Sequence, residues 1–166
     1  DKGQLLITYS QTDLVKFISG IMEAFHYIAE KKDIRFHFSK PFQELHVWID
    51  PNNFDKVIYN VLYNAFKFTP KGGEIEIHLR TTKNMHNEGF LKEYAEITIS
   101  DTGPGIESDN LQKIFDRFYK GSDQGESNPG TGIGLHLART LVEMQHGRIF
   151  ARNRTSRSGS VFYIQM

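Results

Sequence analysis

The stretch "NVLYNAFKFTPKGGEIEIHL", residues 60–79, changes its hydrophobic period once, at a break of proline and glycines. Before the break, apolar residues recur every three or four positions, which is typical of an amphipathic helix. After "TPKGG", Ile75, Ile77 and Leu79 alternate with polar residues, and this alternation predicts a half-buried strand. A helix that gives way to a strand over so short a distance indicates an α/β chain.

The remaining sequence continues this alternation on both sides. With 166 residues, the chain is most simply one domain, 1–166. Its order of elements predicts an α/β two-layer sandwich, in which three helices cover one face of a mixed sheet of about five strands. The expected helices span 12–32, 50–68 and 132–147, with a short helical piece at 107–118, and the expected strands span 5–9, 34–39, 45–49, 74–81, 94–100, 148–153 and 160–166.

The composition narrows the classes of partner and compartment. Lysine plus arginine number 20 and equal aspartate plus glutamate, so we expect neither nucleic acid nor direct membrane contact. There are no cysteines, which excludes a disulfide framework and suits the cytoplasm. No apolar run reaches the length of a membrane span. The chain opens on "DKGQLLITYS", as an excised domain would, so an anchor elsewhere in a parent protein is left open.

Two glycine-rich turns are candidate ligand sites. "GTGIGL", residues 130–135, leads into a predicted helix, whose free N–H groups suit an anion. It lacks the lysine and hydroxyl residue of the common phosphate loop and the spacing of the dinucleotide fingerprint, so a flexible loop is an equal alternative. "SDTGPGI", residues 100–106, ends a strand with Asp101, whose carboxylate suits an exocyclic amine such as that of adenine. The alternative is a tight turn in which Asp101 bonds its own backbone.

A polar stripe runs along the helix predicted over residues 50–68. Asn60, Asn64 and Lys67 lie at i, i+4 and i+7, beside the apolar face. Amide oxygens are ligands for hard cations, and lysine is a point charge for phosphate oxygens. A solvated helix face is the alternative. Tyr59, Tyr63 and Phe66 lie away from the stripe, and we expect them to pack against neighbouring helices.

Taken in order, these motifs resemble a known family. "NVLYNAFKFT", "DTGPGI", "IFDRFYKG" and "GTGIGL" are similar to the N box, first glycine box, phenylalanine box and second glycine box of two-component sensor histidine kinases. The resemblance is to the ATP-binding catalytic domain of these kinases and covers essentially the whole chain. It implies the Bergerat-type (GHKL) ATP-binding fold and, as cofactors, ATP and Mg²⁺.

The resemblance assigns roles to single residues. It implies that Asn64 is the Mg²⁺ ligand and that Asn60 and Lys67 are catalytic groups, which position the metal and the phosphates. Asp101 takes the adenine amino group, Phe115 and Phe118 anchor a lid at 119–129, and the second glycine box closes that lid. The residues it implies at the nucleotide are Asn60, Asn64, Lys67, Phe68, Asp101, Gly103, Gly105, Ile106, Phe118, Gly130, Thr131, Gly132, Gly134 and Leu135.

One position favours phosphoryl transfer over hydrolysis. In related gyrase, Hsp90 and MutL-type ATPases, a glutamate that activates water stands four residues before the magnesium asparagine. Here that residue is Asn60, whose amide is no general base. What remains is positioning ATP for attack by an external nucleophile.

The expected nucleophile lies outside this chain. None of the seven histidines has the sequence context of the family's phosphoacceptor, so the acceptor-histidine domain is absent. The partners that the resemblance implies are a histidine-bearing dimerisation domain of the parent kinase and, downstream, a response regulator receiver domain. Two alternatives stay open: a serine kinase domain of the anti-sigma type, and a non-catalytic module that binds nucleotide.

Overall fold

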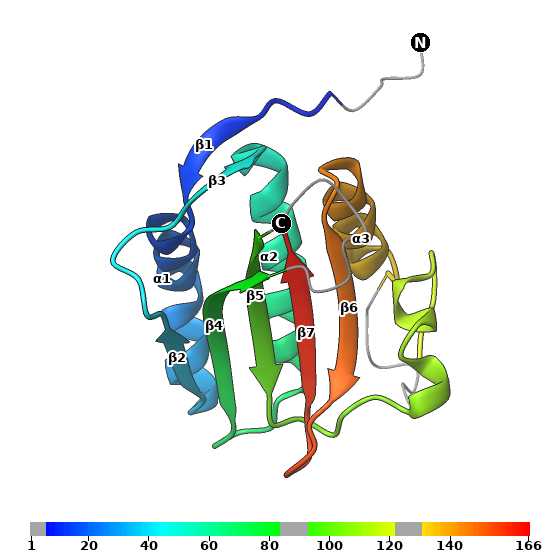
Figure 1. Cartoon of the computed structure of the whole chain (residues 1–166). Coiled ribbons are helices and arrows are strands. Elements are labelled where there is room, and N and C mark those ends of the chain that lie inside the picture. Colours follow the sequence, from blue (N-terminus) through cyan, green and yellow to red (C-terminus); the bar gives the residue numbers. More distant parts are fainter. Residues whose placement is uncertain (1–5, 84–92, 122–130) are drawn as a thin grey trace.

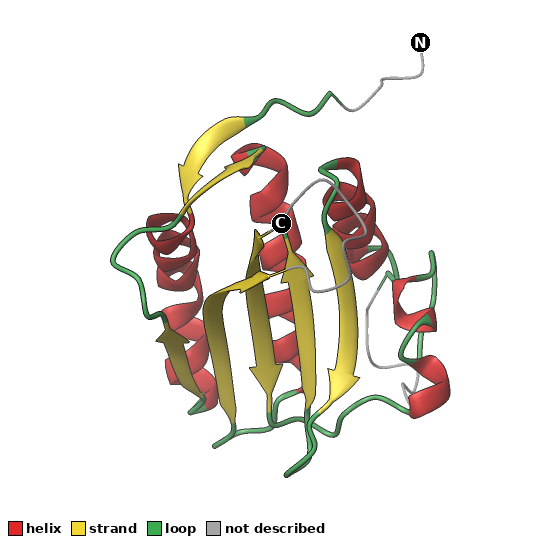
Figure 2. Cartoon of the chain, in the orientation of Figure 1, coloured by secondary structure: helices red, strands yellow, loops and turns green. Residues whose placement is uncertain are grey.

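The computed structural model describes residues 6–83, 93–121 and 131–166, and it is an α/β two-layer sandwich (Figure 1). Helices and strands separate into two layers, with the helices on one face of the main sheet (Figure 2). The three helices are α1 (Leu14–Lys32), α2 (Pro51–Phe68) and α3 (Gly134–Met144). The predicted fold class is therefore confirmed.

The main sheet has five strands in the order β2-β4-β5-β7-β6. β2 pairs with β4 in parallel, and the other pairs are antiparallel, so the sheet is mixed as expected. The strands are β2 (Arg35–Ser39), β4 (Glu74–Lys83), β5 (Glu93–Asp101), β6 (Arg148–Asn153) and β7 (Ser160–Gln165).

A second, two-stranded sheet lies at the ends of α1 and α2. It pairs β1 (Ser10–Asp13) with β3 (His46–Ile49) in antiparallel register. The strand predicted at 5–9 is wrong for residues 6–9, which form no strand, and residue 5 lies outside the described residues. The apolar run misled the prediction because it has no core to cover, as the 79% exposure of Leu6 shows.

The helix ends follow from local chemistry. Oδ1 of Asp13 accepts a hydrogen bond from the Val15 N–H and caps α1. α3 is shorter than predicted, since Gly132 has a φ of 68° just before it and His146 has a φ of 62° just after it. The helical piece expected at 107–118 consists of two 3₁₀ turns, η1 (Ser108–Asn110) and η2 (Lys113–Phe115).

Within the described ranges, no helix has both the length and the apolar character needed to cross a bilayer.

An aromatic cluster joins α1, α2 and β2 in the core. Phe66 is buried, stacks on Phe25 with ring centroids 5.3 Å apart and meets Phe36 edge-on at 5.1 Å. Tyr59 also packs against Phe25, at 5.3 Å, while 41% of it stays exposed. The packing role predicted for these two residues is confirmed. Tyr63 is the exception, because it is 59% exposed and faces the cavity described below.

Asp50 connects the small sheet to two helices. Its carboxylate is 2% exposed, and Oδ2 accepts hydrogen bonds from the Thr8 N–H (2.8 Å) and from Asn53 Nδ2 (2.9 Å). Its backbone N–H donates to Gln145 Oε1, just after α3, at 2.7 Å. Burial raises the pKa of the Asp50 carboxyl, but the hydrogen bonds from Thr8 and Asn53 outweigh burial and hold it below its usual value of 3.8.

We expect Asp50→Asn to lower the free energy of unfolding at pH 7 by about 1–3 kcal/mol, because an amide group then faces donors that need an acceptor. A folded-state pKa below the unfolded value means that ionised Asp50 stabilises the fold above about pH 4 and that this contribution is lost as the pH falls further. Urea unfolding across pH, followed by circular dichroism, measures both effects. The exposed Asp116→Asn is the control, and an equal loss in Asp50→Asn at every pH would contradict the assignment.

Candidate functional site

A cavity of about 870 Å³ opens between α2, the start of α3 and the loop that follows β5. This volume falls in the range of small-molecule and cofactor sites. Of the residues that the sequence predicted at a nucleotide, eleven line it: Asn60, Asn64, Lys67, Phe68, Asp101, Gly105, Ile106, Thr131, Gly132, Gly134 and Leu135. Residues that are far apart in the chain are thus brought together around one space.

Two asparagines of α2, Asn60 and Asn64, line this cavity. Asn60 Nδ2 donates to the Lys56 carbonyl at 2.7 Å, and Asn64 Nδ2 donates to the Asn60 carbonyl at 3.0 Å. Because each amide NH₂ group is held by the preceding turn of the helix, each Oδ1 atom is left available as an acceptor or a metal ligand. Amide oxygens suit a hard cation such as Mg²⁺. This ion takes few protein ligands, and phosphate oxygens and water fill its other coordination positions.

Lys67 adds a positive charge one turn further along α2. Its Nζ atom lies 5.1 Å from the centroid of the Phe68 ring, and both residues line the cavity. The ammonium group is therefore held beside an aromatic ring, and it stays available for an anion.

Asp101 forms the opposite wall, as the last residue of β5. It is 4% exposed, and Oδ1 accepts from the Gly103 N–H at 2.8 Å, which confirms part of the tight-turn alternative. Oδ2 accepts from Ser160 Oγ at 2.5 Å. Each carboxylate oxygen has two acceptor positions, so Asp101 can still accept a hydrogen bond from an exocyclic amine. The two interpretations of this turn are compatible.

Asn153 clamps the loop that follows Asp101, and no sequence motif predicted it there. Its Oδ1 atom accepts from the Ile106 N–H at 2.8 Å, and its Nδ2 atom donates to the Ile106 carbonyl at 2.6 Å. Gly105, with a φ of 84°, lets the backbone turn into this clamp, and a Cβ atom there would lie 3.0 Å from Asn153 Oδ1. No local pattern signals this contact, because Asn153 ends β6 and Ile106 lies in the loop after β5, 47 residues earlier in the chain.

The second glycine box packs directly against α2 and the phenylalanine box. A Cβ atom on Gly134 would lie 2.5 Å from Asn60 Oδ1, and one on Gly132 would lie 2.7 Å from the backbone of Phe118. The Phe118 N–H donates to the Gly132 carbonyl at 2.9 Å. Glycine is therefore required at Gly132, where a side chain would meet backbone, whereas a methyl group at Gly134 would have to displace the Asn60 side chain.

Two of the described residues that were predicted at the nucleotide, Phe118 and Gly103, are not among those that line the cavity. Phe118 has a φ of 66° and is 60% exposed, and the Arg117 guanidinium group lies 4.8 Å from its ring centroid; its place at the nucleotide stays a prediction. Gly103 lies behind the wall, where a Cβ atom would lie 2.9 Å from Asp101 Oδ1. Gly130 and most of the lid predicted at 119–129 lie outside the described residues.

Phe115, the other phenylalanine-box residue, is buried at 4% exposure and meets Phe162 edge-on at 6.1 Å. It ties the short η2 turn to β7, which suits an anchor for the segment that follows. Tyr63 and Asn110 also line the cavity and were not predicted there, whereas Tyr119 and Lys120, which line it too, begin the predicted lid. No motif predicts that Tyr63 or Asn110 faces a ligand.

The donor set fits a nucleoside triphosphate with a divalent cation. One end of the cavity offers two amide oxygens and an ammonium group, and the other offers a buried carboxylate held in place by Ser160. A side chain at Gly134 would fill the space beside Asn60, and one at Gly132 would collide with the backbone of Phe118 and Tyr119. Cation and phosphates match the first end, and an adenine amino group matches the second.

Comparison with known proteins gives a consistent result. The family model described as "Histidine kinase-, DNA gyrase B-, and HSP90-like ATPase" matches residues 49–166. The sensor histidine kinase TmoS of Ectopseudomonas mendocina is 34% identical over 167 residues, which is 100% of this chain and 16% of that protein. The chain therefore spans less than a fifth of the length of this curated relative.

Solved structures share the fold over almost the whole chain. The nucleotide-free catalytic domain of histidine kinase ThkA is 25% identical, with a TM-score of 0.78 over 96% of this chain and 97% of that chain. ThkA in complex with response regulator protein TrrA is 23% identical, with a TM-score of 0.76 over 99% of this chain and 43% of that chain. Full-length ShkA in complex with AMPPNP is 20% identical, with a TM-score of 0.78 over 97% of this chain and 31% of that chain. At these identities, both structures show a shared fold and nothing more.

Gly134→Ala tests the close contact between α3 and α2. We expect the new methyl group to displace the Asn60 side chain and break its hydrogen bond to the Lys56 carbonyl, with little loss of stability. The Asn60 side-chain amide signals in a ¹⁵N NMR spectrum report the displacement. Gly20→Ala is the matched control, since nothing lies within 4 Å of the position that its methyl group would take, and it should raise stability by about 0.5–1 kcal/mol. Unchanged Asn60 signals in Gly134→Ala would contradict the contact.

Proposed function

The chain belongs to the histidine kinase-, DNA gyrase B- and HSP90-like ATPase family, and from this we propose that it binds Mg-ATP and donates the γ-phosphoryl group to a histidine on a separate dimerisation domain. The reaction is then one step of two-component signal transduction. The observation that carries the proposal is that Asn60 and Asn64 both line the cavity while their NH₂ groups are bonded to backbone carbonyls, which leaves both Oδ1 atoms available as ligands.

In this proposal, residues of α2 hold the metal and the phosphates, and Asp101 holds the adenine. Asn64 ligates Mg²⁺ through Oδ1, Asn60 supports the metal and the phosphates, and Lys67 neutralises charge on the phosphate oxygens. Mg²⁺ supplies charge stabilisation for the phosphoryl group. Asp101 accepts the hydrogen bond of the adenine amino group and so orients the nucleotide between the two walls.

Transfer, rather than hydrolysis, is supported by the acids around the cavity. Among the described residues that line it, the carboxylates are Asp101 and Glu107. Both lie at the end of β5 or in the loop after it, and neither is on α2 beside the proposed metal ligand. The position on α2 where related ATPases have a water-activating glutamate is occupied here by Asn60, and its amide cannot act as a general base.

The acceptor and the downstream partner follow from the same proposal. The relatives are much longer proteins, so the histidine-bearing dimerisation domain is proposed to lie in the parent kinase, and a response regulator receiver domain is proposed to take the phosphoryl group next. The structure of ThkA in complex with response regulator protein TrrA supports a partner of this class for a protein of this fold. We propose a cytoplasmic location, where ATP is available.

Asn64→Ala and Asp101→Asn are expected to weaken Mg-ATP binding about 10- to 100-fold each, since each loses a contact to a charged or donor group of the ligand. Asn64→Ala should also abolish most of the gain in affinity that Mg²⁺ gives. Calorimetric titration with ATP, with and without Mg²⁺, measures both. Asn52→Ala, an exposed asparagine on the same helix, is the control. Wild-type affinity in both site variants would refute the assignment.

Incubation with γ-labelled ATP distinguishes the possible acceptors. We expect no stoichiometric phosphohistidine on this chain alone, and acid-labile label on a histidine-bearing dimerisation domain of a sensor kinase that is supplied in trans. Phosphohistidine on the isolated chain would contradict the missing acceptor. Acid-stable phosphoserine on a protein partner would instead support the anti-sigma type of kinase.

A further inference from the structure

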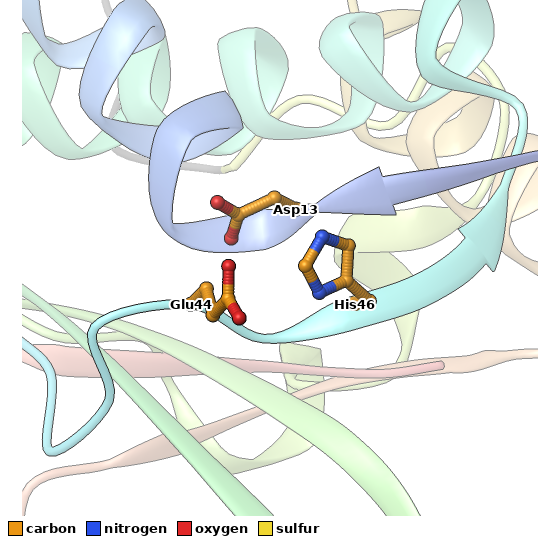
Figure 3. A group of neighbouring side chains, drawn as sticks. All are labelled: Asp13, Glu44 and His46. Carbon is orange, nitrogen blue, oxygen red and sulfur yellow. The ribbon is translucent and has the colours of Figure 1, made fainter.

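A group of three metal-ligating side chains lies in the small sheet, away from the cavity (Figure 3). Asp13 and His46 are directly opposite each other in the β1–β3 pair. Glu44 precedes His46 by two residues, and the ligand atoms of all three lie within 4.8 Å of one another. Figure 3 shows the three side chains directed toward one common space.

Asp13 has an unused carboxylate oxygen. Its Oδ1 atom accepts from the N–H groups of Val15 (3.0 Å) and Leu45 (3.1 Å). Its Oδ2 atom is buried and has no hydrogen-bond partner, although the side chain as a whole is 9% exposed. The nearest cation is Lys16 Nζ at 3.8 Å, on a side chain that is 82% exposed. A buried oxygen without a donor is costly unless a cation satisfies it.

We propose that Asp13, Glu44 and His46 bind a divalent transition metal ion of the Zn²⁺ class. Zn²⁺ accepts a histidine nitrogen together with carboxylate oxygens, and water completes a four-coordinate site. Mg²⁺ fits less well, because it prefers oxygen ligands only. Ligand atoms around Zn²⁺ lie about 3.3 Å apart in a tetrahedron, and Glu44 and His46, both exposed, are free to close the remaining distance.

The metal would act as a clamp on the small sheet. Asp13 ends β1 and caps α1, whereas Glu44 and His46 belong to the segment that leads into and begins β3. Binding therefore joins two segments that are well separated in the chain. None of the three residues lines the nucleotide cavity, so the site does not depend on the proposed kinase function.

Calorimetric titration of the nucleotide-free chain with ZnCl₂ tests the site. We expect one ion per chain with a Kd of about 10 μM or tighter, at least tenfold weaker binding in His46→Gln and Glu44→Gln, and unchanged binding in His26→Gln, an exposed histidine of α1 outside the group. Millimolar Mg²⁺ should not compete. Zn²⁺ should raise the midpoint of thermal unfolding of the wild type but not of His46→Gln.

Asp13→Asn separates metal binding from helix capping, because the asparagine oxygen still accepts from the Val15 N–H while the charge is lost. We expect this variant to keep its circular dichroism spectrum and lose Zn²⁺ affinity at least tenfold. The proposal is overturned if His46→Gln and Glu44→Gln bind Zn²⁺ as the wild type does, or if the wild type binds no ion more tightly than about 1 mM.

Discussion

The rotation of α2 about its own axis is the constraint on which the site depends. Its inner face is made of side chains with no exposure to water, and turning the helix by one residue would bring polar residues such as Lys56 and Asn60 into that face. Asn60 and Asn64 lie next to this inner face, so the burial that holds the helix also aims them at the cavity. Packing of the core thus fixes the positions of Asn60 and Asn64 in the site. The inner face consists of Phe54, Val57, Ile58, Val61 and Leu62.

The register between β5 and β7 determines which residues form the opposite wall of the cavity, around Asp101. Because Ser100 pairs with Val161 across β5 and β7, Ser160 lies beside Asp101 and donates to its carboxylate. The end of β6 supplies Asn153, which clamps the loop that follows Asp101. Three strand ends therefore combine to hold one ligand-binding edge rigidly, while the helices supply the phosphate end.

The small sheet carries two aspartates whose side chains cap the helices that follow its strands. Asp13 ends β1 and caps α1, and Asp50 follows β3 and caps α2, so each aspartate couples a strand to a helix. Asp50 completes its hydrogen bonds with Thr8 and Asn53. Asp13 leaves one oxygen without a donor, and this difference between two similar caps distinguishes a structural carboxylate from a candidate metal ligand.

Hydrophobic period, caps and four ordered motifs determined the fold class, the three helices and eleven of the residues that line the cavity, because these features are local in the chain. Only the tertiary structure decided the pairing of β1 with β3, the clamp of Asn153 on Ile106 and the grouping of Asp13 with Glu44 and His46. It also placed Phe118 in solvent and Tyr63 at the cavity. Such contacts join residues that are far apart in sequence, and their direction depends on backbone turns and strand register that no periodicity records.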